Sequence, residues 1–295
     1  MTQRSPHSNE QQLEQRKCAF RLERPFSRSP TMLIKFISMP SGLQFVGWAG
    51  LGLLMTAAGH VLVRKLIQPP DTHAHNGELG TIIAVVGIFF GLIIATMLAR
   101  AVSHFDAAVE SASHEASLSA ALYRDAAQGS PELAKRVQGP LLRYLESVVQ
   151  TEWPRQSGGL DVAPESSSLA AISRALGDYQ PDTPKQLAYL NMTQRQLDAL
   201  YAARHARLAN GDMTIPGEIW AVKLVGQMTL IVFGWLMRIQ NKLMHFLLVA
   251  GIAVSVSIVL AATLIYDTPF YGDISVSDAP YRQAMRDIET SALAY

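Results

Sequence analysis

Hydrophobic residues in this chain gather in four long blocks, separated by segments of ordinary polarity. Three blocks contain no Asp, Glu, Lys or Arg: Leu43–Val63, Leu79–Ala99 and Leu243–Tyr266, with 21, 21 and 24 residues. A helix rises about 1.5 Å per residue, so about 20 apolar residues cross a hydrocarbon core about 30 Å thick. Each of these blocks therefore predicts a membrane-spanning helix.

The fourth block, Ile219–Met237, is interrupted by Lys223. This lysine lies within about one turn of the end of the block, where we expect its ammonium group to reach the lipid headgroups. Trp220 and Trp235 stand near the two ends of the block, as interfacial tryptophans do. The pattern predicts an all-α integral membrane protein with four transmembrane helices.

The hydrophobic blocks allow two other interpretations. Buried core helices of a soluble protein are disfavoured, because a soluble chain of 295 residues does not need four such runs. The first block resembles a cleaved signal peptide, with Lys35 as its basic region and Ala57–Ala58–Gly59 as a cleavage site. It is longer than the 7–15 residues of a signal sequence core.

The polar segments arrange the four blocks as two hairpins with a soluble helical domain inserted between them. Gln68–Gly77, with two prolines, is the predicted loop of the first hairpin, and Arg238–Lys242 connects the second. Residues 1–31 are a predicted disordered basic tail, although Met32 is also a plausible start. The predicted domains are a tail (1–35), hairpin 1 (36–102), a helical domain (103–217), hairpin 2 (218–267) and a C-terminal tail (268–295).

The helical domain shows helix signals but no strand-like alternation. No Gly or Pro occurs between Gly91 and Gly129, so the second span is predicted to leave the membrane as one long helix. Ser130–Pro131 predicts a new helix start. Two apolar stripes at helical spacing follow: Leu133, Val137, Leu141, Leu145 and Val148, then Leu187, Leu190, Leu197, Tyr201 and Leu208.

Composition and charge narrow the function. Charged residues make up 17% and hydrophobic residues 49%, as a membrane protein requires, and the net charge of +1 gives no argument for nucleic acid. Cys18 is the single cysteine, which excludes a disulfide within the chain. There is no phosphate-binding loop, paired-His helix motif or serine nucleophile motif, so we expect neither an enzyme nor a bound cofactor.

Two groups of polar residues were considered as metal sites. His73 and His75 lie in the predicted loop without a third ligand, and we expect them to be solvated. Glu110 and His114 are four residues apart and can form a surface ion pair, which is favoured over a metal site. We expect no metal centre.

The bias of basic residues predicts the orientation in the membrane. Near the spans, the side of the helical domain carries eight basic residues and the side of the short loops carries four. The eight are Arg24, Arg28, Lys35, Arg100, Arg204, Arg207, Arg282 and Arg286; the four are Arg64, Lys65, Arg238 and Lys242. The positive-inside rule then places the helical domain in the cytoplasm.

The second span carries small residues on one face: Gly80, Ala84, Gly87, Gly91 and Ala95. Small residues four apart allow membrane helices to pack closely, which is the simpler interpretation. The sharper one is that this helix packs closely around a symmetric axis and that its neighbouring face (Ile83, Val86 and Phe90) lines a pore. Phe89 and Phe90 then form a hydrophobic constriction of the kind that gates by dewetting.

Three stretches carry a resemblance to a known family. They are Phe105–Arg124 with Glu115–Ala116, the tripeptide Glu152–Trp153–Pro154, and the sequence after the fourth span with Asp267, Pro269, Phe270, Gly272, Asp273 and Pro280–Tyr281–Arg282. The chain resembles the bacterial bestrophin-like membrane proteins, distant relatives of the bestrophin channels. Bestrophins have an Asn-Pro-Phe-Gly element here, whereas this chain has an extra residue before the glycine, and only Asp273 and Asp278 follow closely. The resemblance therefore does not carry over the calcium clasp of animal bestrophins.

The resemblance implies an oligomer, a pentamer in bestrophins, whose second helix forms a hydrophobic neck that passes mostly anions. We therefore expect a bestrophin-like ion channel in a bacterial inner membrane, with lipid, further copies of itself and a small anion as partners. The alternative is a non-conducting scaffold or sensor whose helical domain binds a partner or ligand. For Pro269 and Phe270 we expect a structural role, clamping the C-terminal tail against the helical domain.

Overall fold

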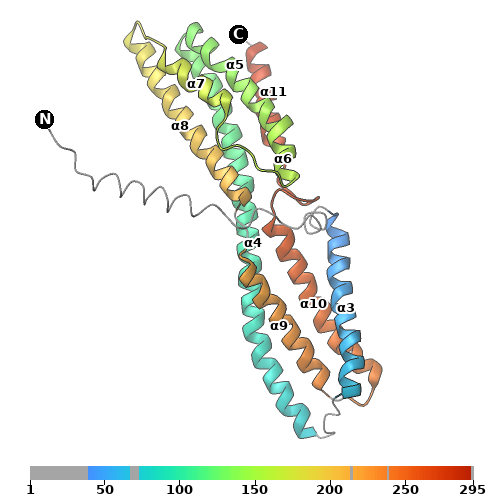
Figure 1. Ribbon diagram of the computed structural model, residues 1–295. Coiled ribbons are helices and arrows are strands. Elements are labelled where there is room, and N and C mark those ends of the chain that lie inside the picture. Colours follow the sequence, from blue (N-terminus) through green and yellow to red (C-terminus); the bar gives the residue numbers. More distant parts are fainter. Residues whose placement is uncertain (1–38, 67–72, 213–214, 238, 294–295) are drawn as a thin grey trace, which may run out of the picture. The chain divides into compact units, whose positions relative to one another are not determined.

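The structure is a computed structural model, which describes residues 39–66, 73–212, 215–237 and 239–293. Within these ranges the chain is helical and contains no strand. The elements, in chain order, are α3 (Ser41–Leu66), α4 (His73–Gly129), α5 (Pro131–Ser147), the π-helix η1 (Val148–Glu152), α6 (Trp153–Ser157), α7 (Ser167–Gly177), α8 (Pro184–Asp212), α9 (Gly217–Leu236), α10 (Lys242–Asp267) and α11 (Ala279–Leu293) (Figure 1). The predicted tail at residues 1–31 and Cys18 lie outside the described residues.

The described residues include four helices long and apolar enough to span a membrane, which confirms the main prediction. The spans are Ser41–Leu62 in α3, a segment of α4, Gly217–Leu236 in α9 and Lys242–Asp267 in α10. Helix α10 packs against α3, α4 and α9, so the two hairpins share one bundle. Asn241 caps α10, because its side-chain oxygen accepts hydrogen bonds from the backbone N–H groups of Leu243 and Met244.

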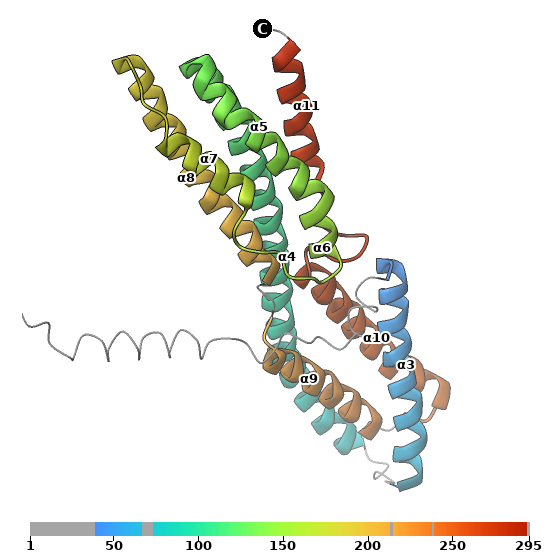
Figure 2. The same ribbon diagram turned by 45° about the horizontal axis from the view of Figure 1, so that its top comes forward.

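Helix α4 runs through the membrane bundle and continues into the part of the fold that contains α5, α7, α8 and α11. We call this second part the helical half. The 57 residues of α4 extend over about 85 Å at 1.5 Å per residue. The first part packs against α9 and α10, and the second part runs along α8, α5 and α11 (Figures 1 and 2). The prediction that the second span continues as one helix is confirmed. The predicted loop at Gln68–Gly77 is too long, because α4 already begins at His73; the side chains of His73 and His75 lie outside the described residues.

The core of the helical half forms around a stripe of alanines on α4. Ala108, Ala112 and Ala116 are at most 2% exposed, and their small side chains let α8 and α5 approach closely. Helix α5 starts as predicted: the hydroxyl of Ser130 accepts a hydrogen bond from the Leu133 N–H at 3.1 Å. The predicted α5 stripe is buried. On α8, Leu190 and Leu197 are buried, whereas Leu187 is exposed.

Candidate functional site

The membrane part of α4 presents large apolar side chains away from the other described helices. Ile88 is 72% exposed, Phe89 67%, Leu92 62% and Val85 51%. In a bilayer such a face can meet lipid, another copy of the chain or a pore. This face is therefore the part of the membrane bundle that is open to further contacts.

The predicted pore residues do not form this face. The Phe90 ring is only 5% exposed and lies against Gly226 of α9, where an added Cβ would come within 2.1 Å of the ring. Ile83 and Val86 are partly buried, and Val86 packs against the apolar cluster around Phe90. The missing side chain of Gly226 leaves a slot that holds the Phe90 ring between α4 and α9, whereas the pore assignment of Ile83, Val86 and Phe90 stays a prediction.

The small-residue face of α4 is largely uncovered by the described helices. Cβ atoms placed on Gly80 or Gly91 would have no described neighbour within 4 Å, and Ala84 and Ala95 are exposed. Only Gly87 approaches another helix, with Leu230 at 4.0 Å from the Cβ position. These positions are free to pack against something outside the chain.

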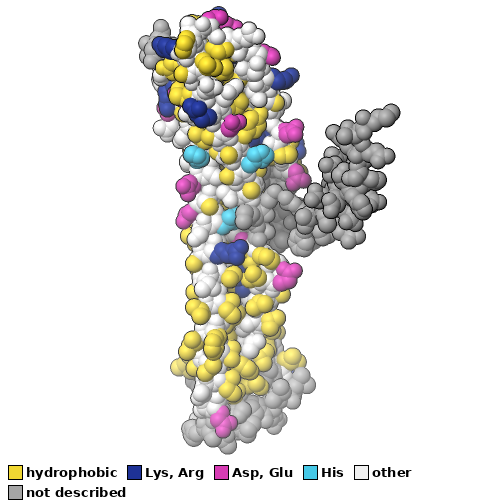
Figure 3. All heavy atoms as spheres, turned by 90° about the vertical axis from the view of Figure 1, so that its left-hand side faces the viewer, with side chains coloured by type: hydrophobic (Ala, Val, Ile, Leu, Met, Phe, Trp, Pro, Cys, Tyr) yellow, Lys and Arg dark blue, Asp and Glu magenta, His cyan; other side chains and the backbone are white. Residues whose placement is uncertain are grey.

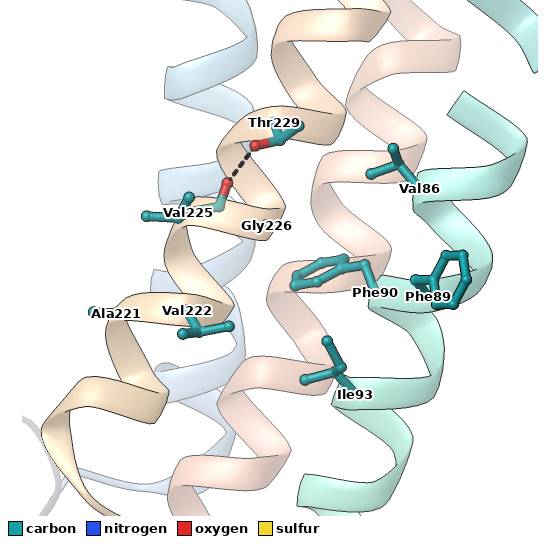
Figure 4. Close-up of a pocket in the computed structure, with 9 residues that line it drawn as sticks. All are labelled: Val86, Phe89, Phe90, Ile93, Ala221, Val222, Val225, Gly226 and Thr229. Atoms are coloured by element: carbon teal, nitrogen blue, oxygen red, sulfur yellow. Dashed lines mark hydrogen bonds between the residues drawn. The ribbon is translucent and has the colours of Figure 1, made fainter. Parts of the chain in front are cut away.

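Between α4 and α9 lies an apolar groove of about 480 Å³ (Figure 4). Its lining comes from Val86, Phe89, Phe90 and Ile93 of α4 and from Ala221, Val222, Val225, Gly226 and Thr229 of α9. The hydroxyl of Thr229 donates to the Val225 carbonyl at 2.9 Å, so even this polar side chain presents no free donor to the groove.

Lys223 does not reach the headgroups as predicted. Its side chain is fully buried, and its Nζ lies 4.1 Å from the centre of the Trp220 ring. The Trp220 ring in turn stacks on Trp48 of α3, with ring centres 6.5 Å apart. A cation on an aromatic face is attracted by the ring quadrupole, so the Trp220 ring replaces part of the stabilisation that water gives to an exposed ammonium group.

A buried ionic network joins five segments of the helical half. The Arg207 guanidinium of α8 donates to Glu115 of α4 at 2.8 Å, to Glu152 of η1 at 2.7 Å and to Gln156 of α6 at 2.6 Å. Arg204 donates to both oxygens of Glu152, at 2.9 and 2.7 Å. Tyr144 of α5 donates to Glu115. Two acids and two bases thus neutralise one another where water is excluded.

Aromatic rings close the network on the side of the C-terminal segment. Arg207 lies 5.8 Å from the Trp153 ring centre and 5.9 Å from that of Tyr281. Trp153 also contacts Tyr281 and Phe270, with ring centres 5.4 and 5.6 Å away. The three stretches that carry the family resemblance therefore meet at one place in the fold.

Burial and charge set the protonation of this network. Burial opposes the charge of Arg207, but the charge of Glu115, its hydrogen bond and the nearby tyrosines together outweigh this effect, and the pKa of Arg207 lies well above its ordinary value. The hydrogen bonds from Arg204 to Glu152 likewise raise the pKa of Arg204 despite its burial. Burial, followed by the negative charge of Glu115, raises the pKa of Tyr144 and of Tyr281. Both arginines stay charged and both tyrosines stay protonated at neutral pH.

The turn after α10 ties three parts of the chain together. The Asp267 carboxylate accepts the Ile215 N–H with both oxygens, at 2.9 and 3.1 Å, and so holds the connection between α8 and α9. Phe270 is 4% exposed and contacts Trp153, and the Pro269 carbonyl accepts the Val276 N–H at 2.7 Å. Gly272 has φ 78°, a conformation that favours glycine.

Asp273 serves the N-terminus of α3. Its two carboxylate oxygens accept the Ser41 N–H at 2.9 Å and the Ser41 hydroxyl at 3.0 Å, from a residue 232 positions away. Asp278 is used differently, in a surface ion pair with Arg282 at 2.6 Å. The described residues contain no group of three or more His, Cys, Asp or Glu side chains placed to hold a metal ion.

Two sequence interpretations near the network differ from the structure. Glu110 and His114 are exposed and form no ion pair in the described part of the chain. Arg204 and Arg207, counted as basic residues beside the membrane, are paired inside the helical half. The spacing of the two arginines indicates their burial, because both continue the buried face of α8. This face includes Leu190, Leu197, Leu200, Arg204 and Arg207.

Comparisons with known proteins agree with this geometry. Residues 50–281 match the family model described as the Bestrophin-like domain. A bacterial bestrophin homologue from Klebsiella pneumoniae, solved as a point variant, has 12% identity and a TM-score of 0.60, covering 84% of this chain and 99% of its own. A crystal structure of a membrane protein, also a point variant, has 12% identity and a TM-score of 0.61, covering 83% and 97%.

At this identity the structural likeness establishes the fold, whereas the family model covers most of the chain. A search of curated proteins gave no match. The four spans, the meeting of the three motif stretches and the family match agree, and the chain belongs to the bestrophin-like family of membrane proteins.

Proposed function

We propose that several copies of this protein assemble into a bestrophin-type ion channel whose pore is lined by α4. The observation that carries this proposal is the row of large apolar side chains on α4 that no described part of the chain covers. An apolar constriction of this kind opens and closes by wetting and dewetting. The family to which the chain belongs supports the assignment.

The lining we propose differs from the one expected from the sequence. Val85, Ile88 and Leu92 follow one another at spacings of three and four, so they form one stripe on α4. All three are more than half exposed, whereas Phe90 is buried against Gly226. We assign the neck to this stripe in place of Ile83, Val86 and Phe90.

The neighbouring copy is proposed to pack on the small residues beside that stripe. Gly80, Ala84, Gly91 and Ala95 have room for a close helix and contact little within the subunit. Small residues are the ordinary means of helix association in a membrane. A pentamer and a small permeant anion rest on the family resemblance.

For the orientation we propose that the helical half faces the cytoplasm of a bacterial cell, in its inner membrane. With Arg204 and Arg207 removed from the count, because they are buried in ion pairs, six basic residues remain on that side: Arg24, Arg28, Lys35, Arg100, Arg282 and Arg286. Four remain on the other side. The bias still favours the same orientation.

Flux in reconstituted liposomes tests the proposal. Ile88→Ala and Leu92→Ala shorten the apolar side chains that line the neck. Both should raise ion flux, because a wider neck is hydrated more easily. Leu248→Ala, at a 52% exposed position of α10, is the matched control and should leave flux unchanged. Reversal potentials in a salt gradient then give the ion selectivity. If fully assembled particles carry no current in any variant, the scaffold or sensor function replaces the channel.

A further inference from the structure

The apolar groove between α4 and α9 ends beside two charged residues that have no partner in the described structure. The groove lies at membrane depth, and its walls carry Phe89, Val222 and Val225, which are 67%, 52% and 65% exposed. Its floor is the Phe90 ring on Gly226 (Figure 4). A slot with these walls accepts a flexible apolar chain.

Arg100 stands on the groove side of α4. Val86, Ile93 and Arg100 are spaced by seven residues, and positions seven apart on a helix deviate by only about 20°. Arg100 therefore continues the line of two groove residues, about 10 Å beyond Ile93 at 1.5 Å per residue. Its side chain is exposed and makes no hydrogen bond or ion pair with any described residue.

Glu218 occupies the corresponding place on α9. It precedes the groove residues Val222 and Val225 by four and seven positions, so it lies on the same helix face. Helix α9 begins at Gly217, which makes Glu218 part of its first turn. The Glu218 side chain is also exposed and, like that of Arg100, unpaired among the described residues.

The two charges lie at about the same depth. Phe90 touches Gly226, and the two helices run in opposite senses from that contact. Arg100 is ten residues beyond Phe90, about 15 Å, and Glu218 is eight residues before Gly226, about 12 Å. Both therefore lie at the end of the groove nearer the helical half. Figure 3 shows the side of the molecule that lies on the left in Figure 1. Hydrophobic side chains cover most of the lower part of this side, and basic and acidic side chains lie above them.

We propose that the groove binds one phospholipid whose headgroup carries both a phosphate and a primary ammonium. An acyl chain fills the apolar slot, the Arg100 guanidinium binds the phosphate and the Glu218 carboxylate binds the ammonium. Arg100 and Glu218 are exposed and form no ion pair with each other in the described part of the chain, so both charges are available to a headgroup. One basic and one acidic group match a zwitterionic headgroup better than an anionic one.

Lipid retention tests this proposal without reference to ion conduction. Purified protein is equilibrated with mixtures of phosphatidylethanolamine, phosphatidylcholine and phosphatidylglycerol, and bound lipid per chain is counted by native mass spectrometry. We expect one phosphatidylethanolamine per chain. Arg100→Gln should lower retention of all three lipids, and Glu218→Gln should abolish the preference for phosphatidylethanolamine. Each change is expected to be about fivefold, as for a single charge at a membrane surface.

Three further variants separate the possible occupants. Val225→Trp fills the groove and should remove the bound lipid while particle mass stays the same. Lys242→Gln, at the opposite end of the spans, and Asp106→Asn, on another face of α4, are the matched charge controls and should change nothing. The proposal is overturned if lipid retention is insensitive to Arg100 and Glu218. It is also overturned if Val225→Trp dissociates the particle, because the groove would then be a contact between copies.

Discussion

Helix α4 passes through two environments, and its two parts are built in opposite ways. In the membrane part many large apolar side chains, such as those of Ile88 and Leu92, point away from the rest of the chain. In the helical half the buried face of the same helix is rich in small residues such as Ala108 and Ala112, while neighbouring helices supply most of the large ones. Lipid solvates apolar side chains, so burial stabilises little in the membrane; in water the same burial is the main driving force.

The two regions also treat charge differently. The helical half buries two arginines and two glutamates, but every charge has a partner of opposite sign. The buried Lys223 of the membrane half rests on the ring of Trp220. Removing one member of a buried pair leaves an uncompensated charge, which costs about 3–5 kcal/mol.

The largest effect should come from the ionic network. Arg207→Met leaves Glu115 and Glu152 without their shared partner, and we expect the free energy of unfolding to fall by about 3–5 kcal/mol. Denaturant titration of the purified particle measures it. Arg136→Met, which removes a surface pair with Glu132 at 2.7 Å, should cost at most about 1 kcal/mol. Equal losses in the two variants would contradict the distinction drawn between buried and exposed pairs.

The next prediction compares two phenylalanines, one buried in the turn after α10 and one exposed in the membrane part of α4. Phe270→Ala should lower the unfolding free energy by about 3 kcal/mol, because the buried ring fills space beside Trp153. Phe89→Ala, at a 67% exposed position facing the groove, should change it far less. Thermal unfolding in one detergent compares them directly. A larger loss for Phe89 would mean that contacts between copies stabilise the particle more than the turn after α10 does.

A pair of glycine variants examines packing inside the membrane. Gly226→Ala places a Cβ within 2.1 Å of the Phe90 ring and should cost about 1–3 kcal/mol through overpacking. Gly91→Ala meets no described atom within 4 Å and should leave the stability of the folded chain unchanged. Resistance of the subunit to unfolding by a denaturing detergent is the measurement. A stable Gly226→Ala protein would show that the Phe90 ring can leave its slot.

The smallest expected effect depends on pH. Hydrogen bonds from Ser41 hold the pKa of Asp273 below its usual value of 3.8, so the link to α3 stabilises the folded state above that value. Its contribution is lost as the pH falls through the lowered pKa. The difference in melting temperature between wild type and Asp273→Asn should thus be constant from pH 7 to 5 and vanish in stronger acid.

Asp106→Asn, a substitution of an exposed carboxylate on α4, serves as the control for Asp273 and should show no such pH dependence. A difference between wild type and Asp273→Asn that persists at the lowest pH would mean that the asparagine disturbs the turn itself. The contribution of the carboxylate charge would then be refuted.

The features that depend on a stretch of neighbouring residues were predictable. The four spans follow from length and hydrophobicity, and the continuity of α4 follows from the lack of Gly and Pro between Gly91 and Gly129. The start of α5 follows from Ser130–Pro131, because an N-cap and a first-turn proline act locally. The three stretches that carry the family resemblance were also identified from the sequence, and the structure brings them together.

What the sequence could not show depends on partners far away along the chain. Periodicity identifies the faces of α4, but only the placement of α9, with the missing Cβ of Gly226, turns Phe90 inward and Leu92 outward. From the sequence, Arg204 and Arg207 on α8 were interpreted as surface charges. The fold pairs them with Glu115 and Glu152, between 52 and 92 residues away. Hydrophobicity is a property of each residue, whereas charge pairing and ring packing are properties of pairs, and only the tertiary structure decides which pairs form.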